Sequence, residues 1–296
     1  MPLLPNEPRV IDETVQQALT EQFLMPAIGE LMVLFVDLRQ SLDTKLSQLR
    51  PLKQDKPYPL GQCLEISEAI FQHLRNLNPC TLKPEAACGF NALRNFVRVG
   101  GSVRQVWGDL RGEYFQNALL LGTLYVDVAN DTVNPYKHPV EILPFAEAKF
   151  APINDFYHFS MVAARYWQAC VYPNHLIPSL APYFPLISLT ADGFVQVQSA
   201  SNYMIALTQA GAFYPSESVL KQALMAKNLF NFMHGRLAAL SVTLAAEPKI
   251  GQTEALAMCA CYREQREVEA LKQRDRSVRE VLHINAELAR FRIKIK

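Results

Sequence analysis

The sequence predicts a helix-rich α+β fold in which a small antiparallel sheet packs on a cysteine-bearing central helix, with helical layers around them. The first observation is that apolar residues recur at helical spacing over much of the chain. The second is a group of short segments, rich in β-branched and aromatic residues and separated by glycine, in the first half of the chain. The third is size, because 296 residues of which 50% are hydrophobic can bury a sizeable core.

Helices open the chain. Residues 12–49 are helical in pattern, and Pro26 and Gly29 predict a break between two helices. The polar, proline-containing segment 50–59 leads into a third predicted helix, 60–77, which should be buried on one side. The apolar stripe of this third helix comprises Ile66, Ile70, Leu74 and Leu77.

Strand-like segments follow a further predicted helix at 84–96. They are short, partly β-branched or aromatic, and separated by glycine or by turn-forming residues. The predicted strands are 102–110, 113–122, 123–131 and 138–145.

The second half of the chain returns to helix. A helix at 155–170 begins at Asp155, whose side chain suits an N-cap. The proline-rich segment 171–187 predicts an irregular connector, and 189–200 predicts a short hairpin or strand. The remaining predicted helices are 201–213, 216–246 and 252–291.

These patterns divide the chain into an N-terminal helical segment, an α+β core, a helical and proline-rich region packed on that core, and a charged C-terminal helical arm. The bounds of these segments are 1–50, 57–150, 151–250 and 251–296. From Tyr262 to the end there are ten Lys or Arg against six Asp or Glu, and few core-sized residues. We therefore expect a solvated helix there, mostly exposed until a partner binds, and not a core helix.

Charge and composition disfavour several classes of function. The formal net charge of +1 disfavours a generic nucleic-acid binder, because phosphate binding draws on a basic excess. The first residues lack the basic-then-apolar layout of a signal peptide. The most apolar early run, 27–38, is interrupted by Glu30 and Asp37 and is too short to span a bilayer. We expect a cytoplasmic protein without membrane insertion.

Neither a cofactor nor a metal site is predicted. The cysteines form no C-x-x-C pair, which disfavours a zinc module and a disulfide scaffold. They are Cys63, Cys80, Cys88, Cys170, Cys259 and Cys261. Asp109, Glu113, Asp127 and Asp131 would hold Mg²⁺ or Mn²⁺ if they converged at strand ends, but turn chemistry explains the segment 130–132 better.

Residues 60–133 resemble the core of transglutaminase-like and papain-like cysteine enzymes. The matching pieces are a helix beginning near Cys63, an intervening strand at 103–109, a strand at 114–122, and a strand that contains Asp127. In these families a cysteine at a helix N-terminus, a histidine on one strand and an aspartate on the next form a triad. The resemblance implies that Cys63 is the nucleophile and Asp127 the carboxylate.

The histidine of such a triad is missing. Its expected position falls at 114–116, and Tyr114, Phe115 and Gln116 cannot act as a base at neutral pH. His138 and His158 are the imidazoles close in sequence, although both also suit packed or surface positions. If the protein is an enzyme, we expect Cys63, His138 and Asp127 to act. We favour no catalytic residue, with Cys63 a small buried apolar group and Asp127 a structural carboxylate held by turn N–H groups or a neighbouring side chain.

The sequence therefore predicts a non-catalytic adaptor or structural subunit of a bacterial cytoplasmic protein assembly, for example of a secretion system. It would use a degenerate cysteine-enzyme fold to bind a protein partner, with the segment 262–296 as a docking arm. The alternative is a cysteine-dependent acyltransferase or hydrolase with a relocated histidine.

Overall fold

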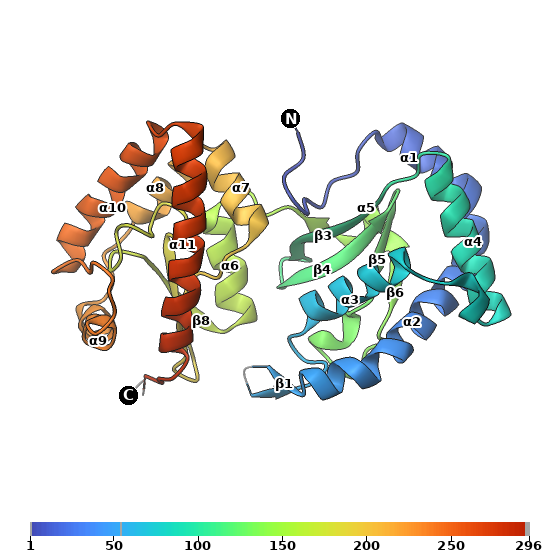
Figure 1. Ribbon diagram of the computed structural model, residues 1–296, viewed down its shortest axis with the longest axis horizontal. Coiled ribbons are helices and arrows are strands. Elements are labelled where there is room, and N and C mark those ends of the chain that lie inside the picture. Colours follow the sequence, from blue (N-terminus) through green and yellow to red (C-terminus); the bar gives the residue numbers. More distant parts are fainter. Residues whose placement is uncertain (1, 54, 294–296) are drawn as a thin grey trace. The chain divides into compact units, whose positions relative to one another are not determined.

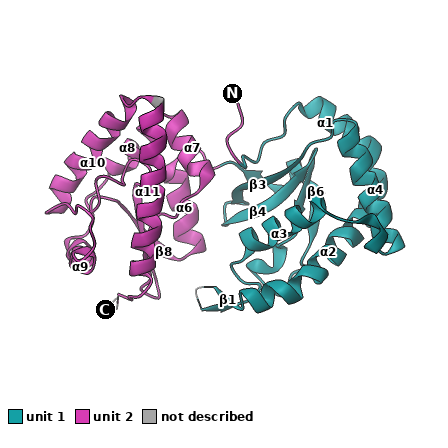
Figure 2. Cartoon of the chain, viewed as in Figure 1, with its two compact units in different colours: residues 1, 6–152 teal, residues 2–5, 153–296 magenta. Residues whose placement is uncertain are grey.

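A computed structural model describes residues 2–53 and 55–293 (Figure 1). The chain forms two compact units, which Figure 2 colours separately. Unit 1 is Asn6–Pro152, and unit 2 is Ile153–Lys296 together with Pro2–Pro5. Helix makes up 52% and strand 15% of the chain, which confirms the predicted helix-rich α+β class.

Unit 1 contains a five-stranded antiparallel sheet in the order β6-β5-β4-β3-β7. The strands of this sheet are β3 (Val103–Leu110), β4 (Tyr114–Leu121), β5 (Leu124–Asp127), β6 (Glu141–Pro144) and β7 (Phe150–Ala151). The four predicted strands are confirmed. Gly122, with φ of +59°, lies in the tight turn between β4 and β5, where a conformation with positive φ favours glycine.

The helices of unit 1 include the predicted pair at the start of the chain. A π-helical turn, Thr20–Leu24, and a 3₁₀ turn, Met25–Ala27, separate the pair, so the break predicted at Pro26 is confirmed. The helices are α1 (Glu13–Leu19), α2 (Ile28–Leu49), α3 (Cys63–Arg75), α4 (Pro84–Arg98) and α5 (Phe145–Ala148). Short elements complete the unit: β1 (Leu52–Lys53), β2 (Lys56–Pro57), η3 (Pro79–Thr81) and η4 (Asn130–Thr132).

One hydrophobic core joins the helices to one face of this sheet. Leu34 and Phe35 of α2, Ile70 of α3, and Leu119 and Val126 of the sheet are all fully buried in it. The segments 1–50 and 57–150 thus share a core. The helical stretch Glu13–Leu49 also has the length and mean hydropathy, 1.4, at which a helix can cross a membrane, and it is the one such stretch in the described chain. Its fully buried leucines here face the core of unit 1.

Unit 2 is mainly helical and contains a three-stranded antiparallel sheet in the order β10-β9-β8. Its strands are β8 (Ala169–Pro173), β9 (Leu186–Thr190) and β10 (Val195–Val197). Its helices are α6 (Phe156–Tyr166), α7 (Asn202–Ala210), α8 (Tyr214–Leu220), α9 (Lys227–Leu237), α10 (Pro248–Arg263) and α11 (Glu267–Leu288).

Two local expectations for unit 2 are confirmed and three are corrected. Two of the corrections are that each of the predicted helices 216–246 and 252–291 is divided into two helices. Asp155 caps α6, where its Oδ1 accepts a hydrogen bond of 2.7 Å from the His158 backbone N–H. The segment 189–200 forms the β9–β10 hairpin. The proline-rich segment 171–187 is irregular only in its interior, because β8 extends to Pro173 and β9 begins at Leu186. Proline is tolerated there because β8 is an edge strand.

The helix α11 is anchored in the core of unit 2, which corrects the expectation of a solvated arm. Most of its surface is exposed, but a stripe at helical spacing is fully or almost fully buried. That stripe is Ser277, Val281, Ile284 and Leu288. Asn285 also binds the end of β10: its side chain accepts a 2.9 Å hydrogen bond from Val197 N–H and donates one of 2.8 Å to Val197 O.

Candidate functional site

Cys63 occupies the first position of α3, as the sequence predicted. Two hydrogen bonds join polar side chains of α3 to Asn117 of β4. Asn117 Nδ2 of β4 lies 3.4 Å from Cys63 Sγ and donates to it. One turn further along α3, the fully buried Ser67 donates a 2.8 Å hydrogen bond to Asn117 O. The side chain that faces the thiol is therefore an amide, which cannot take up the thiol proton.

Strand register separates Asp127 from Cys63. Side chains alternate between the two faces of a sheet, and directly opposed residues share a face. Leu119 of β4 opposes Val126 of β5, and both lie in the core beneath the helices. Asn117 shares the face of Leu119, whereas Asp127 follows Val126 and therefore lies on the opposite face. The structure thus does not assemble the triad that the resemblance implies.

Asp127 is instead the centre of a buried cluster of neutral donors on that opposite face. Gln116 Nε2 donates to Asp127 Oδ2 at 2.6 Å, and the Tyr125 hydroxyl donates to the same oxygen at 3.0 Å. The Ala129 backbone N–H donates to Oδ1 at 2.8 Å. This confirms that a turn N–H and neighbouring side chains satisfy the carboxylate.

The electrostatics of Cys63 and Asp127 also depart from those of a catalytic pair. Desolvation raises the pKa of the Cys63 thiol, and the Asn117 hydrogen bond offsets this only in part. A nucleophilic thiol has the opposite shift. Desolvation raises the pKa of Asp127 to about 6, although the hydrogen bonds from Gln116, Ala129 and Tyr125 favour the charged form.

The two histidines considered as replacement bases are placed elsewhere. His138 Nδ1 lies 2.7 Å from Val140 O, and its own carbonyl accepts a hydrogen bond from Asn130 Nδ2. His158 belongs to unit 2, where its Nδ1 lies 3.3 Å from Asn154 N. Within the described part of unit 1, the His138 imidazole has no hydrogen bond to Cys63 or Asp127.

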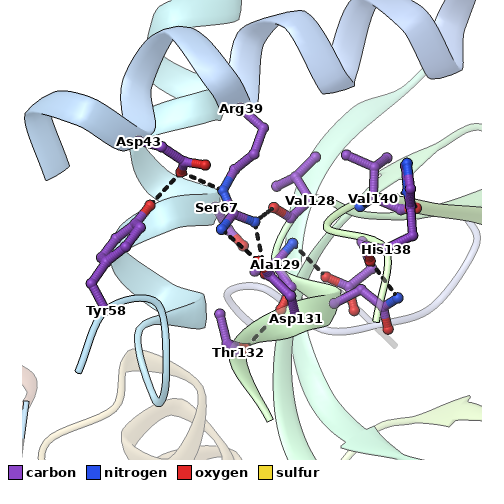
Figure 3. Close-up of polar contacts among 12 residues, drawn as sticks. Arg39, Asp43, Tyr58, Ser67, Val128, Ala129, Asp131, Thr132, His138 and Val140 are labelled. Atoms are coloured by element: carbon purple, nitrogen blue, oxygen red, sulfur yellow. Dashed lines mark hydrogen bonds and ion pairs between the residues drawn. The ribbon is translucent and has the colours of Figure 1, made fainter. Parts of the chain in front are cut away.

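A buried arginine on α2 forms ion pairs with two carboxylates of unit 1 (Figure 3). Arg39 is 1% exposed, and its two terminal nitrogens donate to the two oxygens of Asp131 at 2.8 and 2.9 Å. Its Nε donates to Asp43 at 2.5 Å, and Nη1 donates to Val128 O at 3.0 Å. Tyr58 also donates to Asp43. Burial would lower the pKa of Arg39, but Asp131 and Asp43 together raise it, so the network keeps the guanidinium charged.

This network ties the turn after β5 to α2, and it includes Asp131, one of the four carboxylates that would have to converge to hold a metal. Asp131 faces Arg39, whereas Asp127 faces Gln116 and Tyr125. Over residues 2–53 and 55–293, no group of three or more His, Cys, Asp or Glu side chains is placed to hold a metal ion. The D-x-x-x-D spacing of Asp127 and Asp131 is thus accounted for by two different protein contacts.

A groove between the C-terminal parts of α3 and α4 is the other distinctive feature of unit 1. Its volume is about 1360 Å³, and Val103 at the start of β3 contributes to its lining. Apolar side chains from both helices and from the segment after α3 line it: Phe71, Leu74, Leu77, Phe90, Leu93 and Val97. Three exposed arginines share the lining, namely Arg75, Arg94 and Arg98.

Sequence reasoning missed Asn117, Arg39 and the groove arginines. Two sequence signals point to Asn117 and to two of the groove arginines, but none points to Arg39. Gln116 and Asn117 are successive strand residues and must lie on opposite faces, so only one of them can meet α3. The groove arginines Arg75 and Arg94 each follow a phenylalanine by four residues, which places arginine and ring on the same helix face.

Comparisons with known proteins add no family assignment. A scan against protein-family models found no matching family, and searches of curated proteins and of solved structures found no match. The resemblance to transglutaminase-like and papain-like enzymes therefore stays a prediction.

Proposed function

We propose that the protein is a non-catalytic adaptor or structural subunit of a cytoplasmic protein assembly, and that unit 1 is its protein-binding module. The bacterial machine suggested by the sequence, for example a secretion complex, is the setting we favour. The observation that carries the non-catalytic part is the strand register, which places Asn117 against Cys63 and Asp127 on the opposite face. A thiol with a raised pKa and no adjacent base lacks the requirements of a nucleophile.

Support for a binding role comes from the groove between α3 and α4. It combines apolar side chains with exposed arginines, which is the mixture found at protein interfaces. Asp127 and Arg39, by contrast, form hydrogen bonds with neighbouring groups of the protein. They support a scaffolding role, because they fix the turn after β5 to Gln116 and to α2.

The alternative, a cysteine-dependent acyltransferase or hydrolase, is tested by thiol reactivity. The whole protein is treated with iodoacetamide over pH 6–9, and alkylation of each cysteine is followed by peptide mass spectrometry. We expect Cys63 to react more slowly at neutral pH than Cys80 and Cys88, which are exposed in the same unit. His138→Ala should leave the Cys63 rate unchanged.

A variant that adds a base beside Cys63 provides a second test. Asn117→His places an imidazole next to the thiol, so Cys63 should become more reactive near neutral pH if Asn117 faces it as described. The enzyme alternative takes the lead if wild-type Cys63 is the fastest of the three thiols, with an apparent pKa well below about 8.5 and a dependence on His138.

A further inference from the structure

The groove between α3 and α4 carries the positive charge of three arginines, none of which has an ion pair within the described part of the chain. Arg75, Arg94 and Arg98 line it, and no Asp or Glu is among the lining residues that the structure describes. Among the described residues, no carboxylate forms an ion pair with any of the three. Arg39 in the same unit pairs with two carboxylates, so the lack of carboxylate partners is a property of the groove and not of unit 1 in general.

Two of these arginines are held against groove side chains. The Arg75 guanidinium lies 6.0 Å from the centre of the Phe71 ring, and the Arg94 guanidinium lies 5.9 Å from that of Phe90. Such contacts restrict a long side chain while leaving its N–H donors free to bind a ligand. Planar guanidinium groups bind carboxylates through two parallel hydrogen bonds, which makes a carboxylate-bearing ligand the natural complement.

The size of the groove fits a short segment of helix. From Phe90 to Arg98 its wall runs about 12 Å along α4, which is roughly two helical turns. A helical segment of that length has a volume on the order of 1000 Å³, comparable with the 1360 Å³ of the groove. Small-molecule pockets are mostly smaller, at roughly 300–1000 Å³.

The position of the groove also favours a helix over an added strand. Strand addition requires an exposed sheet edge as the main wall of the site. Of the lining residues that the structure describes, most belong to α3 and α4, and Val103 at the start of β3 is the one from the sheet. Grooves of this type receive the apolar face of an amphipathic helix, with anchors at i, i+3 or i+4, and i+7.

We propose that this groove binds a short acidic amphipathic helix of a partner protein. The apolar face of that helix would contact side chains such as Phe71 and Val97, and its flanking Glu or Asp side chains would pair with Arg75, Arg94 and Arg98. The proposal rests on the proposed function and names the chemistry of the partner. Two helical turns bury a small area, so affinity from this groove alone is expected to be weak.

The test is a selection with the whole protein as target. A displayed library of random 14-residue peptides is selected against the protein, and enriched peptides are synthesised with a fluorophore for anisotropy measurements. We expect enriched sequences to combine apolar residues at helical spacing with two or more acidic residues. Their Kd should rise about tenfold for the double variant Arg94→Ala/Arg98→Ala, because two exposed ion pairs are lost.

A matched control separates the groove from net charge. Lys45→Ala/Lys56→Ala removes the same charge from exposed positions of unit 1 outside the groove, and should leave Kd unchanged. Val97→Glu, at a position 48% exposed, should abolish binding through charge repulsion and should not disturb folding. Replacing the acidic residues of an enriched peptide by Gln should weaken it to a similar degree as the arginine variant.

Three outcomes would overturn the proposal. The first is that selection yields no peptide sensitive to Arg94→Ala/Arg98→Ala, and the second is that it yields neutral or basic peptides. The third is that phosphatidylglycerol vesicles or a single-stranded 20-nucleotide DNA bind in the arginine-dependent manner in place of acidic peptides. None of these would restore the enzyme alternative, which depends on the thiol measurements, so the two hypotheses fail separately.

Discussion

Asp127 and Asp131 lie four residues apart in the chain, and the fold gives them opposite electrostatic surroundings. Asp131 forms a two-point ion pair with the buried Arg39, which ties α2 to the turn after β5. Asp127 is fully buried, and among the described residues its hydrogen-bond donors are the neutral groups of Gln116, Tyr125 and Ala129. The donors supplied by distant segments, and not the spacing of the two carboxylates, therefore decide what each carboxylate does.

The largest expected effect on stability is that of Arg39→Met, which removes the cation from the ion pairs with Asp131 and Asp43. It leaves Asp131 and Asp43 without their cation, and the loss of one partner of a buried pair costs about 3–5 kcal/mol of unfolding free energy. Hydrogen exchange of the β4 amides measures this for unit 1 alone. Lys45→Ala, an exposed change on the same helix, should stay within about 0.5 kcal/mol. A loss below about 1 kcal/mol for Arg39→Met would mean that the ion pairs do not hold α2 in place.

The neutral, buried surroundings of Asp127 predict that the free energy of unfolding depends on pH. Because the pKa of Asp127 is about 6 in the folded protein and ordinarily 3.8, the folded state binds this proton more tightly than the unfolded state does. The contribution of Asp127 to unfolding free energy therefore decreases as pH rises from about 4 to about 6, by on the order of 2–3 kcal/mol.

Asp127→Asn isolates this contribution from that of other carboxyl groups. The difference in unfolding free energy between wild type and Asp127→Asn should shift in favour of the wild type on acidification from pH 6.5 to pH 4. Denaturant unfolding at several pH values measures it. A difference that is constant across this range would show that the carboxylate is not desolvated as described.

The smallest expected effect is at Cys63. Its thiol accepts one weak hydrogen bond from Asn117 and carries no charge near neutral pH, so Cys63→Ala should cost about 1 kcal/mol or less. Cys63→Ser should leave partner binding in a native-cell pull-down unchanged. Ile70→Ala on the same helix, at a fully buried position, should cost about 2–5 kcal/mol and is the reference for a true core change.

The C-terminal helix shows why charge counts can mislead. From Tyr262 onward the basic and acidic residues outnumber core-sized ones, and this composition predicts a solvated arm. A single stripe containing Val281, Ile284 and Leu288 is nevertheless enough to anchor α11. A helix needs apolar residues on only one side to pack on a core, so the position of a few residues matters more than their number.

Local chemistry in the sequence determined which segments of unit 1 form the main helices and strands, although β5 ends at Asp127 and not at 131 as expected. Helical periodicity placed α3 with Cys63 in its first turn, Pro26 marked the break before α2, and glycine and turn residues separated β3, β4 and β5. These predictions succeeded because periodicity and turn chemistry depend on neighbours along the chain.

Only the tertiary structure decided which side chains meet. The register of β4 against β5 placed Asn117 towards Cys63 and Asp127 on the opposite face, because a shift of one residue moves a strand side chain to the other face. The packing of α2 brought Arg39 to Asp131, 92 residues away. Contacts between distant segments depend on the pairing of whole elements, and no local pattern encodes them.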